Sequence, residues 1–144
     1  MKSYIWIMCA FLCIIAAASA VGAGDFDGSK PLLVSVIRVI ECTPDSACQE
    51  VTAAIAGLPQ FLKIDFTNKT IRPAAAGAEM PPSTIERQEI VDGKLILQGA
   101  EDGYENMHDG IGWTMAISET TGQVVLTGSG EQVAFVVFGA CLPQ

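Results

Sequence analysis

The fold is decided by residues 112–141, which read GWTMAISETTGQVVLTGSGEQVAFVVFGAC. This stretch predicts three consecutive β-strands, at 113–118, 123–127 and 132–138, with turns at 120–122 and 128–131. Trp113, Met115 and Ile117 alternate with small or polar residues, which gives the first of these strands one apolar face. The last strand is apolar on both faces, a pattern that is typical of a strand covered on both sides.

The rest of the chain continues the same rhythm of one short strand and one turn about every ten residues. Val and Ile dominate 31–42, and apolar and charged residues alternate along 61–66, which turns at 67–69 into a short return strand ended by Pro73. Strands at 83–90 and 95–99 flank Asp92-Gly93, a strong hairpin signal. We therefore predict an all-β fold, a small antiparallel up-and-down barrel or sandwich of about eight strands, with long loops at 74–82 and 100–110.

Residues 49–58 admit two interpretations. Val51, Ala54, Ile55 and Leu58 lie at helical spacing, and Gly57-Leu58-Pro59 would end a helix. The short connections on both sides favour a strand that pairs back across the cysteine loop. We favour the strand and keep the helix as the alternative.

The N-terminus predicts export. Lys2 precedes an unbroken apolar run, and Ala18-Ser19-Ala20 fits a signal-peptidase site, so we expect residues 1–20 to be a signal peptide. An uncleaved membrane anchor is the alternative, since about 20 apolar residues can span a bilayer. After cleavage we expect no stable membrane span, a flexible lead-in over 21–30, a single β domain over 31–144, and a periplasmic or secreted location.

Charge and cysteine content are informative about partners and compartment. Loss of residues 1–20 leaves seven Lys and Arg against 16 Asp and Glu, a net charge of −9. Such an acidic chain is poorly suited to nucleic acid, because phosphate binding needs Lys and Arg.

Cys42, Cys48 and Cys141 remain after cleavage, so we expect one disulfide and one further thiol, free or bonded to another chain. A Cys42–Cys48 bridge would close a short loop, whereas a bridge to Cys141 would tie the first strands to the last; the sequence leaves both open.

Candidate ligand and metal residues concentrate in the acidic loop 100–110 and beside it. The candidate ligand-binding residues are Trp113, Tyr104 and His108, and the candidate metal ligands are Asp102, Glu105 and Asp109. Clustered carboxylates suit calcium, but their spacing matches no EF-hand, and a solvated loop between strands is the favoured interpretation. If Trp113 faces inward, it is a core residue or the floor of a ligand cavity, which is the favoured interpretation; if it faces outward, it would contact a sugar or a protein. His108 lacks a nucleophile motif, so no catalytic residue is assigned, and no cofactor is implied.

Several short motifs carry a resemblance. They are Cys42 and Cys48 with five residues between them, LPQFLKID (58–65), LILQG (95–99), Gly112-Trp113 and FGAC (138–141). Together they resemble a set of small exported bacterial proteins, and the resemblance implies an all-β domain in the cell envelope without indicating an activity. In size and disulfide content the chain is also similar to periplasmic lysozyme-inhibitor domains, at the level of fold only.

From these observations we expect an exported, non-enzymatic binding module of the cell envelope, for a small molecule or a protein. A hydrolase that uses His108 and neighbouring carboxylates is one alternative. A structural envelope protein without a ligand, dimerised through the odd cysteine, is another.

Overall fold

The computed structural model describes residues 24–75, 80–103 and 109–144, and these residues form strands and turns without a helix. The strands are β1 (Leu32–Thr43), β2 (Ser46–Val51), β3 (Phe61–Asp65), β4 (Thr70–Pro73), β5 (Ser83–Thr84), β6 (Arg87–Val91), β7 (Lys94–Glu101), β8 (Ile111–Ser118), β9 (Gln123–Gly130) and β10 (Val133–Pro143). The predicted all-β class is confirmed, as are the three consecutive C-terminal strands.

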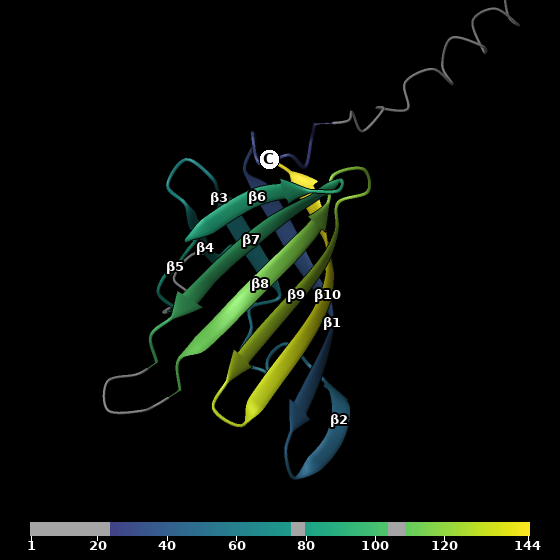
Figure 1. Ribbon diagram of the computed structural model, residues 1–144, viewed down its shortest axis with the longest axis vertical. Helices are drawn as coiled ribbons and strands as arrows, with labels where there is room; N and C mark the ends of the chain where they lie inside the picture. The colour runs from purple at the N-terminus through teal and green to yellow at the C-terminus, as the bar shows by residue number, and fades with distance from the viewer. Residues whose placement is uncertain (1–23, 76–79, 104–108) are drawn as a thin grey trace, which may run out of the picture.

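Nine strands form one curled antiparallel sheet, a half-barrel, in the order β5-β4-β3-β1-β10-β9-β8-β7-β6 (Figure 1). β10 is the central strand of this order, and β1 pairs with it along most of its length. The other edge of β1 is shared: residues 32–35 pair with β3, and residues 39–43 pair with β2. The β1–β2 hairpin therefore projects from the end of the sheet where the β9–β10 turn also lies (Figure 1).

The two ends of the sheet are joined by the short passage from β5 to β6. The Ile85 N–H donates to the Lys69 carbonyl at 2.8 Å, and the Glu86 N–H donates to the Gln98 carbonyl at 2.9 Å. The chain thus crosses from the β4 side of the sheet to the β7 side within two residues. The curl of the sheet brings its two sides close enough for this crossing.

The predicted Asp-Gly hairpin is confirmed between β6 and β7. Val91 pairs with Lys94, and the two residues between them have positive φ, 48° at Asp92 and 71° at Gly93. Two consecutive positive φ values are the signature of a type I′ turn, whose twist matches that of antiparallel strands.

The core lies on the inner face of the curl. Leu95, Leu97, Met115 and Ile117 are fully buried there, and Leu32 and Ile64 complete it from the other arm of the sheet. The alternation along 113–118 is therefore confirmed as inward-facing. Burial of each such side chain stabilises the fold by about 1.5–3 kcal/mol. A smaller cluster of Val36, Val39 and Val137 extends the core toward residues 51–58.

The outer face of β10 departs from the prediction that this strand is covered on both sides. Phe138 is 40% exposed and Leu142 is 65% exposed, and on the neighbouring β9 Val125 is 40% exposed. Within the described ranges no second layer packs on this face. The reason is geometric, because a single curled sheet encloses one core, so its outward residues stay in contact with solvent whatever their polarity.

Residues 49–58 follow neither interpretation throughout. They stay in β2 only as far as Val51. The chain then makes one turn, in which the Leu58 N–H donates to the Ala53 carbonyl at 2.8 Å and the Gly57 N–H donates to the Ala54 carbonyl at 3.2 Å. This pair of bonds, with φ of 67° at Gly57, is the Schellman arrangement that ends helices. The stop predicted at Gly57-Leu58-Pro59 was thus correct. Because β2 extends to Val51, only a single turn fits between the strand and this stop.

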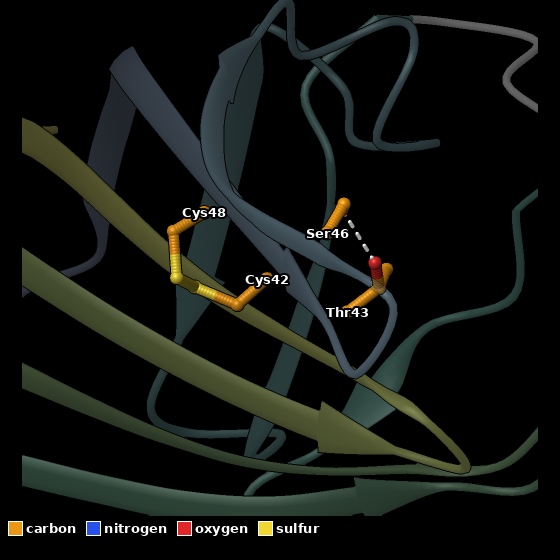
Figure 2. Close-up of a disulfide and its surroundings, with 4 residues drawn as sticks. All are labelled: Cys42, Thr43, Ser46 and Cys48. Carbon is orange, nitrogen blue, oxygen red and sulfur yellow. Dashed lines mark hydrogen bonds between the residues drawn. A yellow bond between two sulfur atoms is a disulfide. The ribbon is translucent and has the colours of Figure 1, made fainter.

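The disulfide joins Cys42 of β1 to Cys48 of β2 (Figure 2). Across the end of the same hairpin, the hydroxyl oxygens of Thr43 and Ser46 lie 2.8 Å apart in a hydrogen bond. The structure therefore selects the short-loop alternative and leaves Cys141 as a buried free thiol. A disulfide in this hairpin is consistent with an oxidising, exported location.

Residues 24–30, part of the segment predicted to be a flexible lead-in, close one end of the core. Phe26 is 3% exposed and belongs to the main apolar cluster. It packs against Gly122, where a β-carbon would lie only 2.6 Å from the Phe26 ring. The predicted signal peptide, residues 1–20, lies outside the described residues, and none of the described residues forms a helix that is long and apolar enough to cross a membrane.

Candidate functional site

An apolar cavity of about 150 Å³ lies inside the half-barrel. It is enclosed by the turn after β2, by β3 and β4, and by the inner faces of β8, β9 and β10. The apolar side chains of its wall include Leu58, Leu62, Ile71, Trp113, Leu126 and Phe135. An apolar cavity of about this volume stays dry in other proteins and accepts a molecule the size of benzene. The cavity is therefore large enough for a small apolar ligand.

Trp113 forms a fixed part of the cavity wall. Its side chain is 8% exposed, and its indole N–H donates to the Ser83 hydroxyl at 2.9 Å. Its cross-strand partner on β7 is Gly99. A β-carbon on Gly99 would lie 2.5 Å from ring atom Cζ2, so the absence of a side chain there creates the space that the indole occupies. This contact gives a physical reason for the glycine of LILQG and the tryptophan of Gly112-Trp113.

Ser83 provides the polar group of this wall. It is 8% exposed and is the one buried polar side chain among the described residues. It sits on β5, where it pairs with Ile71 of β4. Arg72 and Glu101, the other polar residues beside the cavity, are exposed. The interior of the cavity is thus apolar except near one hydroxyl.

A wider space of about 690 Å³ adjoins the cavity and forms its mouth. The two spaces share several lining residues, namely Ala56, Gly57, Met80, Pro81, Glu101, Ile111 and Phe135. Four acidic residues line the mouth, Glu101, Asp102, Asp109 and Glu131. The site therefore combines an apolar interior with an acidic entrance.

The predicted site residues are placed as follows. Trp113 lines the cavity, and Asp102 and Asp109 line the mouth. Tyr104, Glu105 and His108 lie outside the described residues. Over residues 24–75, 80–103 and 109–144, no group of three or more His, Cys, Asp or Glu is placed to hold a metal ion. The proposed carboxylate set includes Glu105, so the metal site remains a prediction.

Cys141 belongs to the core and not to the cavity. Its side chain is 4% exposed, and burial raises the pKa of the thiol to about 12. The thiolate is the reactive form of cysteine, and a thiol with this pKa stays protonated at neutral pH. Burial and the raised pKa therefore both lower the reactivity of Cys141 in the folded protein.

Sequence reasoning missed Ser83 and the contribution of the turn after β2. A signal for Ser83 existed, since a buried indole N–H needs an acceptor, and Trp113 was a predicted core residue. The sequence does not indicate which of its many hydroxyls and carbonyls supplies that acceptor. Ser83 is 30 residues away from Trp113 and becomes its neighbour only through the curl of the sheet.

Comparisons with protein-family models, with curated proteins and with solved structures found no match to this chain. The function is therefore argued from the geometry of the site.

Proposed function

We propose that this protein is an exported, non-enzymatic binding module whose ligand is a small, mainly apolar molecule held in the cavity beside Trp113. The observation that carries the proposal is the cavity itself, about 150 Å³ of space with a mainly apolar wall, open toward the acidic mouth. Well-packed interiors contain few voids larger than a water molecule, because empty space forfeits dispersion contacts. In a protein without a known ligand, a well-formed apolar cavity is the default hypothesis for the binding site.

The arrangement of the wall also supports binding. The indole of Trp113 is held by a hydrogen bond on one side and by Gly99 on the other, so the surface offered to a ligand is preformed. A preformed apolar surface costs little conformational entropy on binding. The alternative of a hydrolase depends on His108, which lies outside the described residues, and gains no support from the cavity.

Export is the second part of the proposal. The Cys42–Cys48 bridge and the predicted signal peptide support a periplasmic or secreted location. The acidic mouth would favour ligands without negative charge, since Glu101, Asp102 and Glu131 would repel an anion.

Tryptophan fluorescence provides a direct test. The chain has two tryptophans, Trp6 and Trp113, and Trp6 lies in the predicted signal peptide. In residues 21–144, Trp113 is therefore the sole tryptophan, and its emission reports on the cavity wall. We expect titration with toluene to change this emission saturably and to raise the melting temperature.

A matched pair of variants locates the binding. Leu126→Phe adds volume inside the cavity, whereas Leu142→Phe makes the same change on the outer face, where the side chain is 65% exposed. Leu126→Phe should weaken toluene binding at least tenfold, and Leu142→Phe should leave it unchanged. A titration that does not saturate, or equal affinities in the two variants, would contradict the proposal.

A further inference from the structure

We infer that the Ser83 hydroxyl recognises the ligand, by donating a hydrogen bond to an oxygen atom of a small apolar molecule such as an aromatic ketone. The inference rests on the proposed function and specifies its ligand class. It starts from the position of Ser83, the one buried polar side chain in the described part of the chain, in the wall of an apolar cavity.

The hydrogen-bonding capacity of the Ser83–Trp113 pair leaves one donor for a ligand. An indole N–H can only donate, so the Ser83 oxygen is the acceptor of their 2.9 Å bond. A serine hydroxyl has a proton of its own to donate in addition. Among the residues that the structure describes, the Trp113 indole is the one hydrogen-bond partner of this hydroxyl.

The surroundings make that remaining proton important. The other residues that line the cavity are apolar except for Arg72 and Glu101, which are exposed. A buried donor without an acceptor is costly, whereas a ligand oxygen would satisfy it. The cavity should therefore prefer a molecule with an accepting oxygen over one of the same shape without it.

The preference can be measured with two ligands of nearly identical shape. Acetophenone carries a carbonyl oxygen where α-methylstyrene carries a methylene group, and the rest of the two molecules is the same. Calorimetric titration of residues 21–144 gives the ratio of the two affinities. The two free ligands differ in hydrophobicity, but this difference is the same for every variant. It therefore cancels when the affinity ratio of one variant is compared with that of another.

A pair of variants separates recognition from support of the tryptophan. Ser83→Ala alone removes the acceptor of the indole as well as the donor to the ligand. We therefore place it in a Trp113→Phe background, where no indole N–H remains to be satisfied. In this background Ser83→Ala should lower the ketone-to-alkene affinity ratio about threefold to tenfold, the range expected for one neutral hydrogen bond.

The outcomes are distinguishable. If both compounds bind and Ser83→Ala leaves their affinity ratio unchanged in the Trp113→Phe background, Ser83 serves only the tryptophan, and the inference is overturned while the binding function stands. If neither compound binds the unmodified chain, the proposed function and the inference fail together.

Discussion

Gly99 is the position where the fold and the site can be tested with one substitution. A β-carbon there would lie 2.3 Å from the carbonyl oxygen of Thr84 and 2.5 Å from Cζ2 of Trp113. Both distances are far below van der Waals contact, and neither a backbone carbonyl nor a hydrogen-bonded indole can yield easily. Overpacking of a core typically costs about 1–3 kcal/mol. With two rigid neighbours, we expect Gly99→Ala to lower the free energy of unfolding by about 3 kcal/mol.

Gly112→Ala is the matched control, because it is the same change on the adjacent strand with no heavy atom within 4 Å of the new β-carbon. It should be neutral or stabilise by up to about 1 kcal/mol, since alanine restricts the unfolded chain. Urea denaturation followed by circular dichroism and by Trp113 emission measures both variants. The reasoning would be refuted if Gly99→Ala were as stable as Gly112→Ala and kept the same emission maximum.

Three further predictions concern the covalent and apolar supports of the fold. Cys42→Ala with Cys48→Ala should lower the free energy of unfolding by about 2 kcal/mol, the chain-entropy value for so short a loop; a denaturation midpoint that does not move would contradict this. Because burial raises the pKa of Cys141 to about 12, the folded state retains a proton that the unfolded thiol loses above pH 9. Stability should therefore fall by up to about 1.4 kcal/mol per pH unit between pH 9 and 12, and Cys141→Ala should show a shallower fall. Phe26→Ala should lower the free energy of unfolding by about 3–5 kcal/mol. Phe61→Ala should lower it far less, because Phe61 is 48% exposed. If thermal denaturation showed equal losses of stability in the two variants, the N-terminal segment would not close the core.

The sequence predicted those features that depend on neighbouring residues. The alternation of Trp113, Met115 and Ile117 identified an inward face, and Asp92-Gly93 identified a type I′ hairpin, because both patterns are set within a few residues. Gly57 likewise signalled a chain reversal, although it ends a single turn and not a helix. In these cases the local conformational preference and the final fold agree.

Features that depend on distant pairing were not predictable. The apolar outer residues of β10, such as Phe138, indicated a covered strand, since the sequence carries no information about which face a second layer would cover. The choice of Cys48 over Cys141 as the partner of Cys42 follows from the β1–β2 hairpin, which brings the α-carbons of Cys42 and Cys48 to 4.1 Å, whereas Cys141 pairs with Val34. The cavity is formed by strands that are adjacent only after the sheet has curled.

The contact between Trp113 and Ser83 links the site to the architecture. Ser83 belongs to β5, at one end of the strand order, whereas Trp113 lies on β8, near the other end. Their hydrogen bond therefore joins the two arms of the half-barrel where β5 lies beside β7. The same bond fixes the indole that lines the cavity. A substitution at either residue will consequently alter stability and binding at once, and loss of binding alone would not distinguish the two roles. This is why the affinity ratio of two ligands of equal shape, measured with and without the indole N–H, is the informative quantity.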